Sequence, residues 1–279
     1  MSQSDGHKKP VVLEYCKVCG EPIKIRLPKL FDNMSLRDAP VICRCNKEQE
    51  EREAEARLKF ERRLNGIRYL RESLMDEKGR AARFDKIIVT GENEKYINAA
   101  KRYCDRWVDN FKNGRGLLFY GGPGRGKTTL AFCIANRLLD DGVEVKAAGV
   151  NDLIQRVKGS FSDGENAEAQ LKELVKNAEL LILDDLGAEY KTEWSTSFIY
   201  DVIDARYRSE RPTIITTNLT LQELKEHLSD RHGVARSFDR LTEMLTPVEF
   251  KLKNYRIEKA RELKETDDFF QPDGVMLTS

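Results

Sequence analysis

The stretch GLLFYGGPGRGKTTL, residues 116–130, decides the fold of this chain. A short apolar run leads into a glycine-rich turn, and Lys-Thr-Thr then opens a helical pattern. The stretch fits the spacing G-x-x-x-x-G-K-[ST], with Gly121, Gly126, Lys127 and Thr128 at its fixed positions. A glycine turn without a ligand is the alternative, but strand, loop and helix follow in the order that a phosphate-binding loop requires. The sequence therefore predicts a triphosphate site.

The chemistry of a triphosphate explains this spacing. Its oxygens must be wrapped by backbone N–H groups, and glycines let the chain approach closely and turn sharply. The following helix points its unpaired N–H groups at the phosphates, while Lys127 reaches the β and γ oxygens and Thr128 a magnesium ion. We expect ATP and Mg²⁺ as cofactors, with the nucleotide held by Gly122, Pro123, Gly124, Arg125, Gly126, Lys127, Thr128 and Thr129.

Composition limits the class of protein. The 279 residues suffice for one sizeable α/β domain and a smaller module, and 40% of them are hydrophobic. Lys and Arg number 48 against 47 Asp and Glu, so any nucleic-acid surface must be local. The first ten residues lack an apolar signal core, and no apolar run approaches the roughly 20 residues of a membrane span. We expect a cytoplasmic protein without a membrane partner.

Four of the six cysteines fall in the first 45 residues, as two close pairs. Disulfides are rare in a reducing compartment, so we interpret the two pairs as a metal-binding pattern. Each pair can present two thiolates to one tetrahedral ion, and the residues between them, 21–30, have the pattern of a short hairpin or ribbon. Ordinary thiols or an iron–sulfur site are the alternatives. We predict that the zinc is structural, because four cysteines close its coordination sphere. Its ligands would be Cys16, Cys19, Cys43 and Cys45.

Residues 46–79 are densely charged and contain no proline. Glu and Arg or Lys recur four residues apart in the favourable order, which predicts a helix. An apolar stripe marks its second half, at Leu58, Phe60, Leu64, Ile67, Leu70 and Leu74. The segment is either a solvated connector or a helix whose stripe is covered by the neighbouring domain or by a partner protein.

Beyond this linker, strand and helix patterns alternate, which predicts a mostly parallel sheet with its ligand at the carboxyl ends of the strands. After the phosphate loop, strands are expected over residues 143–148, 180–183 and 213–217. Helices are expected over residues 93–111, 127–139, 151–158, 167–178 and 195–209. The predicted organisation is a zinc module over residues 1–46, a charged helical linker over 47–81, a nucleotide-binding domain over 82–260 and a flexible tail over 261–279.

A second chemical motif is LLILDDLG, residues 180–187, an apolar strand that ends in two carboxylates. It resembles a Walker B strand, which would place Asp184 beside the phosphate loop to order magnesium and Asp185 where it can position the attacking water. Following a phosphate loop at this distance, the pattern is specific. Asn218 ends the next strand and suits a hydrogen bond to the same water or to the γ-phosphate, although a turn is the alternative role.

Five motifs together carry a family resemblance: GGPGRGKTTLA, LLILDDLGAE, TIITTNLT, RSFDRL and NYR, in this order. They resemble the ATPase domain of bacterial and phage replicative-helicase loaders of the DnaC/DnaI type, a branch of the AAA+ superfamily, over residues 82–259. The resemblance implies that Arg236 is an arginine finger reaching the γ-phosphate of a neighbouring subunit, and that Arg256 is the sensor 2 arginine. Active sites would then lie at contacts between copies of the chain.

The resemblance also implies the partners. Helices between the second strand and the Walker B strand, here residues 151–178, would face single-stranded DNA, and the zinc module would contact the hexameric replicative helicase. The expected function is an ATP-driven loader that delivers this helicase onto single-stranded DNA. A transposition helper ATPase of the IstB type and a nucleotide-gated helicase adaptor with little turnover are the alternatives. Two departures stand out: Asp185 replaces a common Glu, which predicts slow hydrolysis, and the helical lid of larger AAA+ proteins is expected to be absent.

Overall fold

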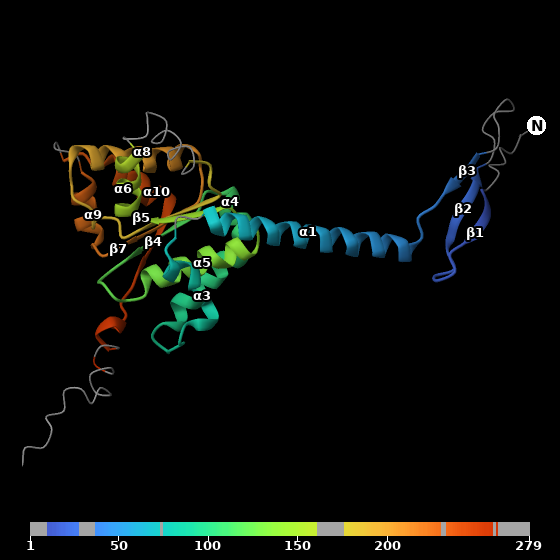
Figure 1. The fold of residues 1–279 in the computed structure, drawn as a ribbon, viewed down its shortest axis with the longest axis horizontal. Helices are drawn as coiled ribbons and strands as arrows, with labels where there is room; N and C mark the ends of the chain where they lie inside the picture. Colours follow the sequence, from blue (N-terminus) through green and yellow to red (C-terminus); the bar gives the residue numbers. More distant parts are fainter. Residues whose placement is uncertain are drawn as a thin grey trace, which may run out of the picture. The chain divides into compact units, whose positions relative to one another are not determined.

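The structure, a computed structural model, describes residues 10–27, 37–72, 75–160, 176–229, 233–258 and 261 (Figure 1). The chain divides into two compact units, Met1–Glu61 and Arg62–Ser279. The division falls within helix α1 (Arg44–Glu72), which contains most of the charged linker.

The first unit is built around a small antiparallel sheet. Its strands, in spatial order, are β1 (Val11–Tyr15), β2 (Pro22–Leu27) and β3 (Arg37–Pro40), so the ribbon expected over residues 21–30 is the central strand of three. An ion pair between Arg26 and Asp38 joins β2 to β3 at 2.8 Å. Among the described residues of this unit, Cys43 alone is buried. So small an apolar core cannot hold the sheet by itself, which is the condition under which a metal supplies folding free energy.

Helix α1 forms where the charge pattern predicts a helix. Arg52 and Glu48 make one of the expected i,i+4 ion pairs, at 3.5 Å. Three residues of the predicted apolar stripe are exposed, Leu58, Phe60 and Leu64. The side chains of its other members, Ile67, Leu70 and Leu74, lie outside the described part of the structure. Whether the neighbouring domain or a partner protein covers the stripe is therefore still open.

The second unit contains a parallel five-stranded sheet, which confirms the predicted fold class. The spatial order is β5-β6-β7-β4-β8. The strands are β4 (Gly116–Tyr120), β5 (Val145–Gly149), β6 (Leu180–Asp184), β7 (Thr213–Thr217) and β8 (Leu245–Glu249). The edge strand β8 has no counterpart in the sequence prediction, because Pro247 and three exposed or half-exposed neighbours hide its strand pattern.

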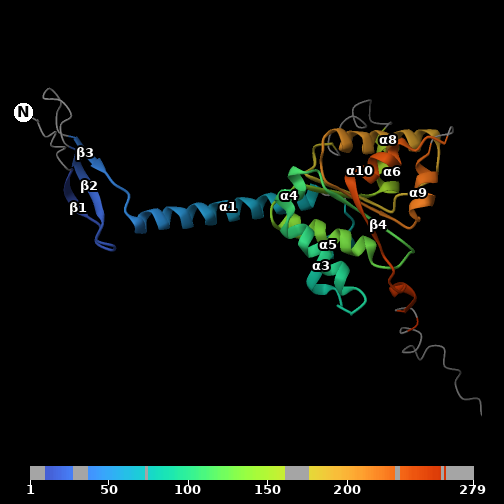
Figure 2. The same cartoon turned by 180° about the vertical axis from the view of Figure 1, so that it is seen from behind.

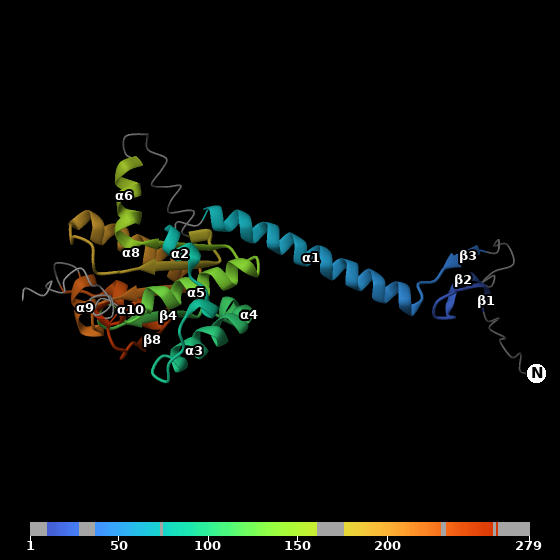
Figure 3. The same ribbon diagram turned by 60° about the horizontal axis from the view of Figure 1, so that its bottom comes forward.

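Helices cover both faces of this sheet, as the two opposite views in Figures 1 and 2 show. On one face lie α3 (Glu94–Asp105) and α5 (Lys127–Asp140), with α2 (Glu77–Ala81) and α4 (Trp107–Lys112) beside them; a 3-10 turn, η1 (Phe84–Lys86), precedes α3. The other face carries α6 (Val150–Ser160), α8 (Glu193–Arg208), α9 (Leu221–Leu228) and α10 (Arg236–Met244), which are also seen in Figure 3. None of the helices in the described part of the chain is long and apolar enough to cross a membrane.

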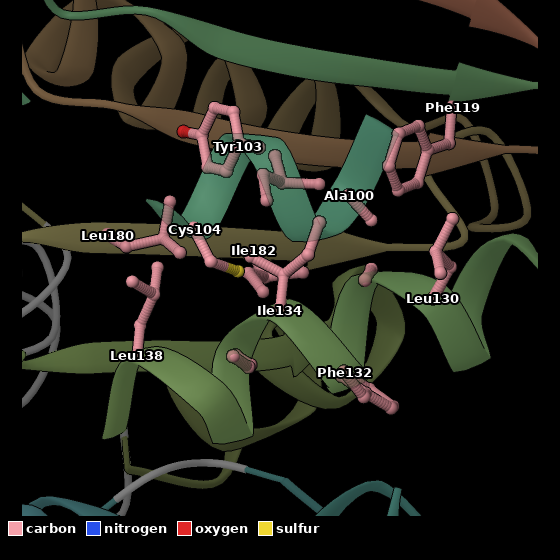
Figure 4. Packing of buried hydrophobic residues seen from close by; sticks show 14 of the residues in the cluster. Ala100, Tyr103, Cys104, Phe119, Leu130, Phe132, Ile134, Leu138, Leu180 and Ile182 are labelled. Carbon is pink, nitrogen blue, oxygen red and sulfur yellow. The ribbon is translucent and has the colours of Figure 1, made fainter. Parts of the chain in front are cut away.

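Each layer has its own apolar core. Figure 4 shows the core between α3, α5 and the sheet, where Cys104 of α3 and Ile134 of α5 lie beside Ile182 of β6. The two cysteines outside the N-terminal pairs, Cys104 and Cys133, are both buried, and burial raises the pKa of the Cys133 thiol to about 11. They pack as small apolar side chains.

Some predicted boundaries moved. The helix expected over residues 93–111 breaks at Arg106 into α3 and α4. The helix expected over residues 151–158 is slightly longer and begins at Val150. The second helix expected in that region, over residues 167–178, lies largely outside the described residues. Helices α9 and α10 are short and were not predicted.

Candidate functional site

The three predicted motifs of the nucleotide site meet at one edge of the sheet. Strands β6, β7 and β4 are neighbours and parallel, so their carboxyl ends lie side by side. The phosphate loop follows β4, the Asp-Asp pair ends β6, and Asn218 follows β7. Residues nearly a hundred positions apart are thereby brought within hydrogen-bonding distance of one another.

Lys127 lies at the centre of this arrangement. Its ammonium donates to the carbonyl oxygens of Gly121 and Gly122 at 2.7 and 2.9 Å and to Oδ1 of Asn218 at 2.7 Å. The side chain is only 4% exposed, and burial lowers its pKa against the opposing effect of the nearby Asp185 charge. The ammonium is thus held at the mouth of the loop by neutral acceptors, which do not cancel its charge.

Asp184 is fixed from two sides. Its Oδ1 accepts a hydrogen bond from Thr216 at 2.6 Å, and the Thr128 hydroxyl bonds the same carboxylate. Burial raises the pKa of Asp184, and the Asp185 charge adds to this, while the two hydroxyls act in the opposite direction. A carboxylate beside the threonine hydroxyl of a phosphate loop is the oxygen donor set that Mg²⁺ prefers, so these two residues fit a magnesium ion.

Asp185 has an unusual backbone. Its φ is +56°, in the left-handed region, which costs a residue with a side chain about 1–2 kcal/mol. Its Oδ1 accepts from Nδ2 of Asn218 at 3.2 Å, and its backbone N–H donates to the Thr216 hydroxyl at 3.0 Å. The strained turn is therefore held by side chains of the neighbouring strand, which is the usual condition for strain at a functional position.

The phosphate loop is packed against the segment that follows β8. Tyr255 donates its backbone N–H to the carbonyl of Gly124 at 3.0 Å, and the Arg125 guanidinium donates to the carbonyl of Phe250 at 2.8 Å. The loop has φ +70° at Gly124, and a Cβ placed there would lie 2.0 Å from Oδ1 of Asn254. Glycine is therefore required at this position both for conformation and for space.

A cavity of about 540 Å³ opens beside this loop. Every predicted nucleotide-binding residue except Gly122 lines it, together with Asp185, Asn218 and Arg256. Ile88, Tyr96 and Tyr255 also line it. None of these three residues was predicted to line the site, because they come from separate segments of the chain and share no local pattern. Asn93 holds the segment around Ile88 in place by accepting from the Thr90 N–H at 2.8 Å and donating to the Ile88 carbonyl at 2.9 Å.

A second cavity, of about 710 Å³, also adjoins the helix that follows the loop. Thr128, Asp184, Asp185 and Arg256 line it, so both cavities reach the phosphate end of the predicted site. Its outer wall comes from the linker helix α2 and from the first turn of α6.

Arg236 is the one residue predicted for the nucleotide site that lies elsewhere. It starts α10 and lines a separate cavity of about 560 Å³ bordered by α8 and α9. Its side chain is exposed. Four residues on, Arg240 has its guanidinium over the rings of Tyr200 and Tyr207, at 5.0 and 5.5 Å, and pairs with Asp204. Arg240 is thus engaged within its own chain, whereas Arg236 faces outward.

The four N-terminal cysteines converge as predicted. All four sulfur atoms lie within 4.8 Å of one another, and Sγ of Cys45 is 3.4 Å from that of Cys16 and 3.3 Å from that of Cys43. Two sulfurs on one tetrahedral zinc ion lie about 3.8 Å apart, given a Zn–S bond of about 2.3 Å. Hydrogen bonds from the backbone at Cys19 and Val18 lower the pKa of Cys16 to about 6, so a thiolate is favoured there. The cluster fits a zinc ion in size and in ligand type.

Comparison with known proteins places this geometry in a family. The family model described as IstB-like ATP binding protein matches residues 49–263. The uncharacterized protein YdaV of Escherichia coli strain K12 is 32% identical over 171 residues, which are 61% of this chain and 67% of that protein. The replicative helicase loader DnaC of the same strain is 31% identical over 135 residues, 48% of this chain and 54% of that protein. The chain thus matches about half the length of DnaC.

Solved structures agree with the sequence relatives. The crystal structure of DnaI superposes with a TM-score of 0.56 at 26% identity, over 64% of this chain and 96% of that one. The family match begins at residue 49, so the N-terminal cysteine cluster lies before its first residue.

Proposed function

The chain belongs to the family of IstB-like ATP-binding proteins, and from this premise we propose that it is an ATPase that delivers a replicative ring helicase onto single-stranded DNA. The observation that carries the proposal is the hydrogen-bonded chain Lys127–Asn218–Asp185, which joins the phosphate loop to the two neighbouring strand ends. Relatives named as replicative helicase loaders support the loader class.

The nucleotide would enter the first cavity with its phosphates at the loop. They would lie against the backbone N–H groups of residues 124–129 and the positive end of α5, where anions are stabilised. The base would then lie among the other lining residues, which include Ile88, Tyr96 and Tyr255. A cavity of about 540 Å³ falls within the usual range for a ligand of this size.

Hydrolysis would be supported by the two carboxylates in different ways. Thr128 and Asp184 would hold Mg²⁺, which neutralises the charge that develops on the phosphate oxygens. Asp185, directed by the Asn218 amide, would orient the attacking water. Lys127 would contact the γ-phosphate, and Arg256, which lines both cavities, would contact it from the side of the C-terminal segment.

Asp185 also bears on the rate. An aspartate side chain is one methylene shorter than glutamate, but the left-handed backbone and the Asn218 bond change the direction in which it projects. Glu189 does not compensate for the shorter side chain, because its carboxylate is turned to His227 and to the N–H of Gly187. We expect slow turnover that rises when subunits assemble.

The zinc module and the DNA surface complete the loader. We propose that the module around Cys16, Cys19, Cys43 and Cys45 contacts the helicase, and that the region between β5 and β6 faces single-stranded DNA. Residues 161–175 of that region lie outside the described structure, so the contacting residues are left to experiment. Self-association through the nucleotide-binding domain would bring Arg236 of one copy to the γ-phosphate of the next.

ATP turnover, with and without single-stranded DNA, tests the enzyme. Wild type should hydrolyse ATP, Lys127→Ala should not, and Lys112→Ala, an exposed lysine on α4, should match wild type. Normal turnover by Lys127→Ala would contradict the site. Capture of the replicative helicase by the immobilised chain separates a loader from an IstB-type transposition helper, and helicase capture without measurable turnover would identify the adaptor alternative.

A further inference from the structure

Thr216 lies within the motif TIITTNLT, but none of the predicted roles falls on it. It lies in the middle of the sheet on β7 and is fully buried. It lines neither cavity beside the phosphate loop, so it would not touch nucleotide or magnesium. A buried threonine in a central strand could serve packing alone, yet its hydroxyl bonds to the turn that carries the two functional carboxylates.

One residue secures three successive residues of that turn. The Thr216 hydroxyl donates to Oδ1 of Asp184 at 2.6 Å and accepts from the backbone N–H of Asp185 at 3.0 Å. Its carbonyl accepts from the N–H of Leu186 at 2.9 Å. A hydroxyl has one proton to donate and lone pairs to accept, so both side-chain bonds form at once.

Each hydrogen bond of the Thr216 hydroxyl fixes the orientation of one carboxylate. The bond to Asp184 uses one carboxylate oxygen and fixes the rotation of the group, and thereby the aim of its other oxygen. The bond from the Asp185 N–H stabilises a backbone at φ +56°, which sets where the Asp185 side chain begins. Displacement of either carboxylate by about an ångström would misplace the metal or the attacking water. Such a displacement can lower the rate of hydrolysis by about a hundredfold.

We infer that Thr216 is a positioning residue for ATP hydrolysis, whose hydroxyl aims Asp184 at the metal and holds Asp185 in the conformation that places the attacking water. The inference rests on the proposed ATPase function. It assigns a part of the site to the strand interior, two residues before Asn218, rather than to the residues that face the nucleotide.

Substitution by valine isolates the hydroxyl. Thr216→Val keeps the branched shape and volume that the core requires but removes both side-chain bonds. Partners behind a metal ligand are typically worth about 10–100-fold in metal affinity or activity. We expect Thr216→Val to lower kcat by about 10–100-fold, to raise the Mg²⁺ concentration for half-maximal activity by about tenfold, and to leave the KM for ATP at saturating Mg²⁺ within about threefold.

Two further variants separate positioning from packing. Thr216→Ser retains a hydroxyl and should recover activity and Mg²⁺ response to within about threefold of wild type. Thr217→Val removes an equally buried hydroxyl from the next residue, one that donates to the Leu186 carbonyl at 2.6 Å and touches neither carboxylate. It should cost stability without moving the Mg²⁺ dependence. Thr216→Cys, a weak donor of similar size, replaces Thr216→Val in the comparison if the valine variant does not fold.

A binding measurement keeps the inference separate from the proposed function. Affinity for a fluorescent, non-hydrolysable ATP analogue is measured in EDTA and then across a Mg²⁺ titration. For Thr216→Val we expect wild-type affinity in EDTA and loss of most of the gain that Mg²⁺ brings. An Mg²⁺ response within twofold of wild type, or a serine variant as impaired as the valine one, would overturn the inference. Absence of turnover in wild type would refute the ATPase proposal. The binding comparison would still show whether Thr216 supports the Mg²⁺ response.

Discussion

The carboxylate of Glu189 lies 2.6 Å from Nε2 of His227 and takes a second hydrogen bond, of 2.8 Å, from the backbone N–H of Gly187. The Glu189 side chain is 1% exposed and that of His227 17%. The pair fastens the loop after β6 to helix α9, which begins three residues after Asn218. The two segments that flank the nucleotide site are therefore joined a second time, behind it.

Loss of this pair should weaken the fold. Glu189→Ala leaves the Gly187 N–H and the His227 ring without their partner in a buried place, and we expect a loss of about 2 kcal/mol in the free energy of unfolding. Denaturant unfolding measures it, with Glu50→Ala on the exposed face of α1 as the matched control. A loss no larger than that of the control would show that the pair contributes nothing.

The same pair predicts a pH dependence. Burial alone would raise the pKa of Glu189, but hydrogen bonds from His227 and from the backbone outweigh it and hold the pKa below its ordinary value of 4.5. A pKa that is lower in the folded than in the unfolded chain contributes stability above about pH 4.5 and loses it as the pH falls through the folded value. The stability difference between wild type and Glu189→Gln should be greatest near neutral pH and shrink in acid. A difference that stayed constant below pH 4.5 would contradict this.

Much of the site could be predicted because its residues are tied to spacing. The phosphate loop, the Asp-Asp strand end and Asn218 each follow an apolar strand, and parallel strands bring their ends together whatever lies between. The four cysteines were predictable for the same reason, since a zinc knuckle is a local pattern.

The rest depends on tertiary contacts that leave no local pattern. The contact of Glu189 with His227 leaves no such pattern, because His227 is 38 residues away on a short helix that was not predicted. The lining of the nucleotide cavity combines Ile88 and Tyr96 with Tyr255, and β8 is an edge strand of mixed polarity. Arg236 and Arg240 are alike in sequence and differ only in what surrounds them.

Crowding at Gly124 should make the phosphate loop intolerant of a side chain. Gly124→Ala combines a left-handed backbone with a Cβ that would lie 2.0 Å from the Asn254 amide oxygen. We expect ATP affinity to fall at least about tenfold, roughly 1.4 kcal/mol, as measured by equilibrium binding. Gly233→Ala is the matched control, since φ there is +76° but nothing lies within 4 Å of the added Cβ. Wild-type ATP affinity in Gly124→Ala would show that the loop rearranges to accept the added methyl group.

Partial recovery should follow from a second change. Asn254→Ala removes the atom that the new Cβ meets but leaves the backbone strain. We therefore expect the double variant Gly124→Ala, Asn254→Ala to regain part of the lost affinity. Equal losses in the single and double variants would assign the defect to strain alone.

Zinc should support only the N-terminal unit. Cys43→Ser, or removal of metal by a chelator, should release one zinc ion per chain and unfold the segment before about residue 46, because thiolate–zinc bonds replace an apolar core there. ATP binding should not change, since the nucleotide site lies in the other unit. Lys17→Ser, in the same knuckle but exposed, is the control and should keep its zinc. Loss of ATP binding on chelation would contradict this separation.

The helicase contact should be lost with the zinc. We expect wild type to capture the helicase and Cys43→Ser to fail, with Lys17→Ser unaffected. A chain beginning at Ala82 should bind ATP but not the helicase. Full helicase binding by that shortened chain would show that the N-terminal module is not the main contact.

Hydrolysis should require a second subunit, because Arg236 faces away from its own nucleotide site. It lines a cavity bordered by α8 and α9, whereas Lys127 lines the cavity beside the phosphate loop. An arginine placed on the transition-state charge by a neighbour is worth about 10³-fold or more in rate. Specific activity should therefore rise with protein concentration, and isolated monomers should bind ATP but turn it over slowly.

Mixing two inactive variants decides the point. Arg236→Ala and Lys127→Ala should each be inactive alone, but a mixed assembly contains interfaces that pair an intact phosphate loop with an intact Arg236, so activity should partly return. Arg240→Ala is the matched control, because the Arg240 guanidinium is held by Asp204 and two tyrosine rings of its own chain. Loss of this side chain should lower stability. Mixing Arg240→Ala with Lys127→Ala should not restore activity. Complementation by Arg240→Ala but not by Arg236→Ala would move the finger to Arg240. No recovery with Arg236→Ala, in a mixture shown by sedimentation to co-assemble, would rule out its action across the interface.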